Sequence, residues 1–341
     1  SDEAHRSIGG NARAVFEYFI GYKLGLTATP KDYLKNITNI DERDPREMER
    51  RLLMDTYKTF GCGSGEPTFR YSLIEGVHDG FLINPIVTDA RTEITTQLLS
   101  DRGYSVQVEN PETGEVEEAI YSHRHFERKF YSTKTNQVFC KTFMENALHD
   151  PISGEIGKTI IFCVSQKHAS KITQILNEYA HQLFPDKYNS DFAVQITSSI
   201  TGAQQYTINF TNNNLNGQTK WLDSYKSSKT RVCVTVGMMT TGYDCQDILN
   251  LCLMRPIFSP TDFVQIKGRG TRTFTFNYKD RNPNGEMETV KEEKEAYKVF
   301  DFFANFEYFE TEFDYDEELR VTLGSDIVIK RGDPPIYKDE Y

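Results

Sequence analysis

The sequence of 341 residues lacks the features that would place it in or across a membrane. No apolar run approaches the roughly 20 residues that a membrane-spanning helix needs, and no basic-then-apolar segment of the secretory type opens the chain. Its six cysteines include no C-x-x-C pair, and several lie in apolar runs, which indicates buried, reduced thiols. These absences predict a cytoplasmic protein with no membrane partner.

An excess of positive charge is also lacking. The formal net charge is −11 at pH 7, which argues against a protein that coats nucleic acid nonspecifically. A local basic track is still compatible with this value, because charges farther apart than about 8 Å are largely screened at physiological salt. The basic residues do cluster in one stretch, which holds Lys267, Arg269, Arg272, Lys279 and Arg281.

What the sequence does have is an alternation of short apolar runs with helical patterns, over a length that suits two domains. Residues 168–179 have helical spacing, and a run at 22–27 predicts the last part of a preceding α/β domain. Strands that are apolar on both faces and separated by helices predict a parallel sheet covered on both sides. The runs that predict such strands are 158–165, 192–197, 231–236 and 248–254.

Changes in composition divide the chain into four expected parts. Residues 1–85 are predicted to be the C-terminal part of a first lobe, and residues 158–285 a second lobe. Residues 86–157 are predicted to link them, and residues 286–341 to form an acidic C-terminal extension.

Two stretches between these lobes and at the end of the second one are less regular. Within the linker, a hairpin is expected between residues 104 and 121, and a bridging helix within 126–148. The polar stretch 277–295 is expected to be a loop, with residues 282–285 at its tip.

The first residues, Asp2-Glu3-Ala4-His5, resemble motif II of superfamily 2 helicases. Magnesium needs a carboxylate that holds it directly or through water, and the attacking water needs a second carboxylate to orient it. On this interpretation Asp2 binds Mg²⁺ and Glu3 orients the water. No strand precedes the pair to hold it, so we expect a piece of a longer protein. The alternative is a solvated acidic N-terminus.

Two further segments carry hydroxyls at the ends of apolar runs. Leu26-Thr27-Ala28-Thr29-Pro30 resembles motif III, and Thr235 to Asp244 resembles motif V. Thr240 and Thr241 suit phosphate oxygens, Gly242 lets the backbone approach a ligand, and Asp244 suits a ribose hydroxyl or a neighbouring arginine. The alternative is that the threonines satisfy backbone groups at strand ends.

Gln265-Ile-Lys-Gly-Arg-Gly-Thr-Arg272 resembles motif VI, Q-x-x-G-R-x-x-R. We expect Arg269 and Arg272 to lie one turn apart on a helix, where both can point at one site. A guanidinium there stabilises charge on a transferring phosphoryl group. The alternative is a solvated basic helix start.

Two segments only imitate functional motifs. Gly157-Lys158-Thr159 would end a phosphate-binding loop if residue 152 were glycine, but Ile152 stands there, so Lys158 simply opens a strand. Glu292-Glu293-Lys294 has the E-x-K form of many nucleases, yet no Pro-Asp pair accompanies it. We interpret it as a solvated surface.

Together with Asp2-Glu3-Ala4-His5-Arg6-Ser7, the motif V and VI segments are similar to the motor region of the R subunit of type I restriction enzymes. The resemblance covers about residues 1–305. It implies an α/β fold with two RecA-like parallel-sheet lobes, the first incomplete. It also implies ATP, Mg²⁺ and translocation along double-stranded DNA in a complex with modification and specificity subunits.

The resemblance also implies roles for individual residues, by position in the motifs. Glu3, Arg269 and Arg272 are expected to be catalytic, and Asp2 to bind Mg²⁺. The nucleotide is expected to contact Asp2, His5, Gly242, Asp244 and Gln265, and DNA to contact Thr29, Thr197, Thr240 and Thr241.

In that family a nuclease domain and a phosphate-binding loop precede the matching segment. Neither lies in these 341 residues, so the chain alone is not expected to hydrolyse ATP. Two other interpretations stay open. One is another superfamily 2 motor, such as a repair helicase, and the other is a catalytically silent lobe that binds DNA.

Overall fold

The computed structural model describes residues 4, 14–15, 18, 21–28, 30, 56–63, 66–90, 133–240, 242–257, 260–281, 286–306 and 309. The chain divides into two units, Ser1–Glu75 and Gly76–Tyr341. The predicted hairpin between residues 104 and 121 lies outside the described residues, as does the loop tip 282–285.

The first unit contains helix α3 (Thr56–Thr59), and α4 (Leu73–His78) crosses into the second unit. The backbone N–H of Ala4 donates to the carbonyl of Leu26 over 2.9 Å. The prediction of a buried strand at 22–27 is wrong, because these residues are irregular and Leu26 is 61% exposed. A strand needs neighbours to accept its backbone hydrogen bonds, and the described residues of this unit form no strand.

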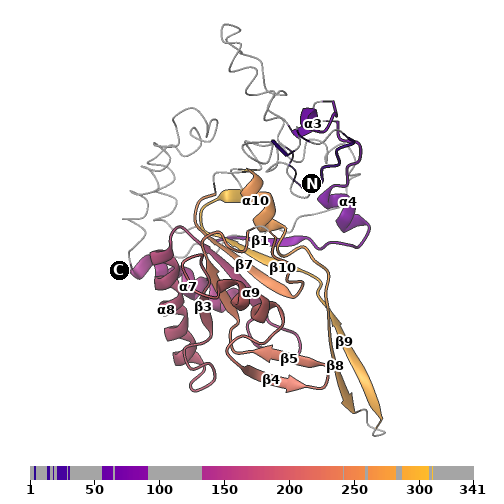
Figure 1. Ribbon diagram of the computed structural model, residues 1–341. Coiled ribbons are helices and arrows are strands. Elements are labelled where there is room, and N and C mark those ends of the chain that lie inside the picture. Colours follow the sequence, from indigo (N-terminus) through magenta and orange to yellow (C-terminus); the bar gives the residue numbers. More distant parts are fainter. Residues whose placement is uncertain are drawn as a thin grey trace. The chain divides into compact units, whose positions relative to one another are not determined.

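The second unit is built on a six-stranded sheet in the order β1-β10-β7-β2-β6-β3, in which every neighbouring pair is parallel (Figure 1). All residues of β2, β6 and β7 are buried, as a sheet covered on both faces requires. The strands are β1 (Pro85–Asp89), β2 (Lys158–Cys163), β3 (Ala193–Gln195), β6 (Val232–Thr235), β7 (Ile248–Met254) and β10 (Tyr297–Asp301).

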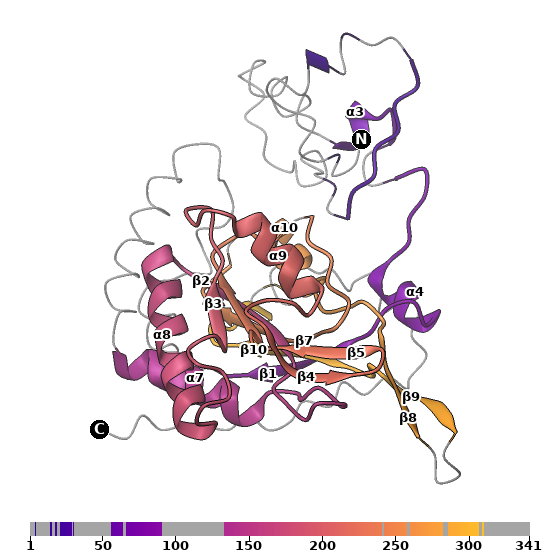
Figure 2. The same cartoon turned by 60° about the horizontal axis from the view of Figure 1, so that its bottom comes forward.

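Helices cover both faces of this sheet (Figure 2). Phe139, Phe143 and Ile172 from α7 and α8 pack on one face, and Phe210 and Phe263 from α9 and α10 pack on the other. Successive side chains of a strand point to opposite faces, so each buried strand contributes side chains to the hydrophobic cores on both faces of the sheet. The helices are α7 (Thr133–Asn146), α8 (Gln166–Leu183), α9 (Ala203–Thr211) and α10 (Pro260–Lys267).

The predicted parallel sheet is confirmed, and its central strands lie where the apolar runs placed them. The expected helix at 168–179 is α8, whose first turn is capped by the Ser165 hydroxyl accepting from the His168 N–H. The sheet also takes two strands, β1 and β10, from outside residues 158–285. The four-part division of the chain therefore stays a prediction.

Two antiparallel hairpins extend from the sheet. The first joins β4 (Gln218–Leu222) to β5 (Tyr225–Ser228), and the second joins β8 (Thr275–Arg281) to β9 (Met287–Glu293). Figure 1 shows the second hairpin projecting well beyond the sheet. The expectation of a loop across 277–295 is therefore wrong. Seven residue pairs join its strands, although nearly all of their side chains are exposed.

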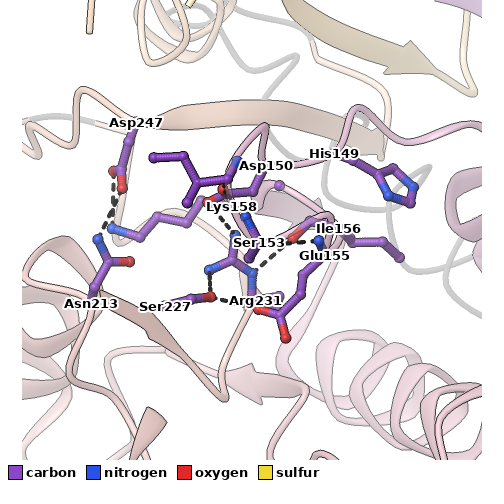
Figure 3. A network of polar contacts seen from close by, with 12 residues as sticks. His149, Asp150, Ser153, Glu155, Ile156, Lys158, Asn213, Ser227, Arg231 and Asp247 are labelled. Carbon is purple, nitrogen blue, oxygen red and sulfur yellow. Dashed lines mark hydrogen bonds and ion pairs between the residues drawn. The ribbon is translucent and has the colours of Figure 1, made fainter. Parts of the chain in front are cut away.

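A network of buried charges ties together the amino ends of the central strands (Figure 3). Arg231, 1% exposed, donates from Nε to the Ile156 carbonyl over 2.8 Å and from Nη2 to the Asp150 carboxylate over 3.3 Å. Its Nη1 donates to the Ser227 hydroxyl, which donates in turn to Glu155 over 2.6 Å. Each buried polar group thus has a partner, as burial demands.

The second pair of the network joins β2 to the segment before β7. Lys158 Nζ lies 2.9 Å from the Asp247 carboxylate (Figure 3). It also donates to the Thr211 carbonyl over 3.0 Å. Burial raises the pKa of Asp247, but the positive charge of Lys158 and its hydrogen bond outweigh this and hold the pKa below its ordinary value. Asn213 donates a further hydrogen bond to the same carboxylate.

We predict that Asp247→Asn lowers the free energy of unfolding by about 3–5 kcal/mol, because it leaves the Lys158 ammonium buried without its counter-charge. Urea unfolding followed by circular dichroism measures this. Because the folded pKa of Asp247 is lowered, the stabilisation is present above the unfolded pKa and is lost as the pH falls through the folded one.

The matched control is Asp223→Asn, whose carboxylate is exposed and lies 3.9 Å from Lys279. This substitution should change the free energy of unfolding by no more than about 0.5 kcal/mol. Adding Lys158→Met to Asp247→Asn should recover most of the loss. If Asp247→Asn alone lowered the free energy of unfolding by less than about 1 kcal/mol, Asp247 would not be the needed counter-charge of Lys158.

Candidate functional site

The structure describes seven of the residues that the sequence assigned to a site, and all seven belong to the second unit. They are Thr197, Thr240, Gly242, Asp244, Gln265, Arg269 and Arg272. The other five lie outside the described residues: Asp2, Glu3, His5, Thr29 and Thr241.

The motif V segment follows β6 and returns to the start of β7. Its first turn is held by the Thr235 hydroxyl, which accepts from the Met238 N–H over 3.2 Å. Gly242 has a φ of +67°, in the left-handed region where side chains are rarely tolerated. The segment therefore needs a glycine at this position to turn toward β7.

The arginines of motif VI both contact this segment. Arg272 Nε lies 3.2 Å from the Asp244 carboxylate, and the two side chains are 53% and 60% exposed. The Arg269 guanidinium donates to the Tyr243 carbonyl, and its Nε donates to the Gln265 carbonyl over 3.1 Å. Motifs V and VI, which are about 25 residues apart in sequence, thus meet through neighbouring residues.

The prediction that both arginines lie on a helix is wrong. Helix α10 ends at Lys267, Arg269 lies in the following turn, and Arg272 forms an antiparallel bridge with Leu82. The helix ends before the arginines because Gly268 and Gly270 follow it, and glycine is unfavourable inside a helix and common just after its end. A side chain at Gly270 would overlap the ring of Tyr297.

The two described threonines differ in their hydrogen bonding. The Thr197 hydroxyl is 3.1 Å from that of Ser199 and accepts from Gln195, so it is used inside the protein. Thr240 is 6% exposed, and its hydroxyl has no hydrogen-bond partner among the described residues. A buried hydroxyl without a partner costs about 1–3 kcal/mol, so this position suits an external acceptor.

Tyr243 and Gln265 are largely packed away. The Tyr243 hydroxyl accepts from Thr211 over 3.1 Å, its ring packs against the core beneath α9 and α10, and burial raises its pKa. Gln265 is 5% exposed on α10. Tyr243 is therefore poorly placed for stacking on a base.

Sequence reasoning missed Lys294, which the E-x-K pattern suggested was solvated. Its side chain is buried, at 5% exposure, and its ammonium donates to the carbonyls of Gln246, Gly270 and Arg272 over 2.8–3.0 Å. The only sequence signal was its place just before the Tyr297 strand.

The predicted residues fall into two groups within this unit. Thr197 and Thr240 follow the carboxyl ends of β3 and β6, which lie at one edge of the parallel sheet. Asp244 and Arg272 lie where the chain approaches the amino ends of β7 and β10. Thr240 and Asp244 are four residues apart in the same motif V segment, so this segment connects the two groups.

No family model matches the chain. Over 277 residues, 80% of its length, it is 27% identical to the endonuclease subunit of type I restriction enzyme EcoAI from Escherichia coli. Over 268 residues it is 26% identical to the endonuclease subunit of EcoKI from Escherichia coli (strain K12). The chain is homologous to the endonuclease subunit of type I restriction enzymes. It spans 29% and 19% of the lengths of these two relatives.

A solved structure shows the same fold. A fragment described as an HsdR subunit of a type I restriction enzyme from Vibrio vulnificus YJ016 aligns with 89% of this chain and 44% of its own, with a TM-score of 0.52 and 24% identity. The chain therefore has a RecA-like α/β fold with a six-stranded parallel sheet.

Within the described residues, no three histidine, cysteine, aspartate or glutamate side chains gather as metal ligands would. No helix in the same part of the chain is long and apolar enough to span a bilayer. Five of the six cysteines are buried, which confirms the prediction for them.

We predict that Thr240→Val leaves the free energy of unfolding unchanged or raises it by up to about 1 kcal/mol, because a methyl group replaces an unsatisfied buried hydroxyl. Thermal and urea unfolding measure the change. The matched control is Thr235→Val, which removes the hydrogen bond to the Met238 N–H and should cost about 1–3 kcal/mol. Equal losses in both variants would show that Thr240 has an internal partner.

Proposed function

We propose that the chain is part of the ATP-driven motor of a type I restriction enzyme R subunit, and that this motor moves along double-stranded DNA. The observation that supports this most is the pairing of Asp244 with Arg272 at 3.2 Å. It joins two motifs that a nucleotide-hydrolysing motor needs side by side. Homology to the endonuclease subunits of EcoAI and EcoKI is consistent with it.

The position of the Arg272 guanidinium suits a contact with the transferring phosphoryl group. Its guanidinium is half exposed, and the Asp244 carboxylate holds it through Nε, which leaves the fork of the guanidinium available to a phosphate. Arg269 has a different geometry, because it is tied to the backbone carbonyls of Tyr243 and Gln265. We therefore assign charge stabilisation to Arg272 and support of the motif V segment to Arg269.

The remaining nucleotide contacts are assigned from the motifs. Asp2 would hold Mg²⁺, since a carboxylate is the ligand that this ion prefers, and bound Mg²⁺ would neutralise charge on the phosphates. Glu3 would orient the attacking water, while His5, Gly242 and Gln265 would contact the nucleotide. The sequence has no G-x-x-x-x-G-K-[ST] segment, so we assign the phosphate-binding loop to another part of the intact protein.

The DNA track is assigned to hydroxyls at strand ends. The hydroxyl of Thr240, which has no partner among the described residues, suits a phosphate oxygen, and phosphate contacts hold DNA without reading its sequence. Thr29, Thr197 and Thr241 are assigned to the same track. The packed Tyr243 phenol does not favour stacking on unpaired bases. This supports movement on duplex DNA, alongside modification and specificity subunits that select the sequence.

Arg272→Ala and Glu3→Gln, made in the intact R subunit, are each expected to lower ATP turnover by roughly a thousandfold. Arginine-finger losses have this size, because charge that develops in the transition state loses its partner. ATP binding should mostly survive, since the effect belongs to the transition state. Steady-state hydrolysis and equilibrium nucleotide binding measure the two.

Arg281→Ala is the matched control, since Arg281 is also exposed but lies at the end of β8. Its turnover should stay near that of the wild type. Near-normal turnover in Arg272→Ala would remove Arg272 from the mechanism and favour a silent DNA-binding lobe.

The assembled complex is expected to displace a triplex strand from duplex DNA in the presence of ATP while failing to separate a plain duplex. The reason is a grip on phosphates rather than on unstacked bases. Triplex-displacement and strand-separation assays on the same preparation measure both activities. Efficient unwinding of the duplex would instead indicate a conventional helicase.

A further inference from the structure

Lys294 lies between hairpin strand β9 and sheet strand β10, outside motifs V and VI. Its ammonium donates to the carbonyl oxygens of Gln246 over 2.9 Å, Gly270 over 2.8 Å and Arg272 over 3.0 Å. A lysine ammonium has three N–H donors and no acceptor. All three donors are therefore used, each on a backbone carbonyl.

These carbonyls belong to the two segments that carry the Asp244–Arg272 pair. Gln246 lies two residues after Asp244, and the third carbonyl is that of Arg272 itself. The ammonium thus holds the end of motif V and the end of motif VI at one point. Three converging carbonyl dipoles repel one another unless a cation lies between them.

The titratable side chains near Lys294 are Asp247 and Cys245, from the segment before β7, and Tyr297, from β10. Burial lowers the pKa of Lys294 to about 8, while the nearby Asp247 carboxylate and, to a lesser extent, the Cys245 side chain act in the opposite direction. The ring of Tyr297 lies 5.8 Å from the ammonium. A neutral amine has only two N–H donors for three carbonyls, so the clamp weakens when the ammonium loses its proton.

We propose that Lys294 is a positioning residue for Arg272. By clamping the carbonyls of Gln246, Gly270 and Arg272, it fixes the two segments in the register in which Asp244 meets the guanidinium. The catalytic part of this inference rests on the proposed function, in which Arg272 stabilises the transferring phosphoryl group. The clamp itself is a property of this chain and is testable without ATP.

Lys298 is the matched control. It lies four residues away on β10, and its ammonium also donates to a backbone carbonyl, that of Asn146 at the end of α7, over 2.8 Å. Burial lowers its pKa as well. It has no hydrogen bond to motif V or VI among the described residues, so Lys298→Met changes a half-buried lysine without touching the clamp.

The first measurement is hydrogen–deuterium exchange on the full chain at pH 7, for the wild type, Lys294→Met and Lys298→Met. Lys294→Met should speed exchange in residues 242–247 and 268–274 by about tenfold or more, while β2 and β7 stay protected. Lys298→Met should leave both segments as in the wild type. Unchanged exchange in Lys294→Met would overturn the clamp, whether or not Arg272 acts in hydrolysis.

The second measurement is ATP turnover by the intact R subunit in its complex. Lys294→Met should lower kcat by about a hundredfold, the cost of displacing a catalytic group by about 1 Å, with KM within about twofold. Loss of exchange protection with unchanged kcat would overturn the positioning role. If Arg272→Ala also left kcat unchanged, the failure would belong to the proposed function instead.

The pH dependence separates positioning from a purely structural role. Since the folded pKa of Lys294 is lowered from 10.5 to about 8, the unfolded chain binds more protons in that range. The stability of the wild type relative to Lys294→Met should therefore rise with pH above about 8. Wild-type kcat should fall over the same range, and this fall should be absent in Lys294→Met. A kcat that follows stability upward would overturn the proposal.

Discussion

Strand β7 is the constraint on which the candidate site depends. It pairs in parallel with β2 on one side and β10 on the other, and all seven of its residues are buried. Parallel strands require a connection that returns across the sheet before each strand can start. The segment before β7 and the segment before β10 must therefore both return to the same edge, which is where Asp244 and Arg272 meet.

The buried charges at this edge follow from the same constraint. Lys158 opens β2 and Asp247 immediately precedes β7, so pairing of these two strands places a cation and an anion together. Lys294 precedes β10 and holds the neighbouring carbonyls. Each charge thus stabilises the place where one strand begins, and together they fix the chain segments on which the exposed arginine is mounted.

Much of the sheet could be predicted from the sequence, because β2, β6 and β7 are apolar on both faces. β1 and β10 were not predicted, since they have five residues each and polar groups such as Lys298 and Asp301 interrupt the pattern. The sequence predicts a loop in place of the β8–β9 hairpin for a related reason. Its strands are mostly exposed, and only Phe276 and Tyr278 of β8 give a short alternation of apolar and polar residues.

The site was predicted in part. Asp244 was expected to accept from a ribose hydroxyl or to hold a neighbouring arginine, and the structure shows the second of these in its pairing with Arg272. The helical placement of Arg269 and Arg272 failed at Gly268 and Gly270, where backbone freedom outweighed the helical spacing. The role of Lys294 could not be predicted from the sequence, because its partners are three backbone carbonyls. Every residue has such a carbonyl, so the residue types do not indicate which ones the lysine contacts.

The β8–β9 hairpin is closed at its base, and this affects how its length can change. The Lys294 N–H donates to the Phe274 carbonyl over 2.8 Å, so the two ends of the hairpin are joined directly where they leave the sheet. Residues can be gained or lost beyond this junction without moving β10 or the arginine beside it. A change in hairpin length is therefore expected to leave the lysine at its base in place.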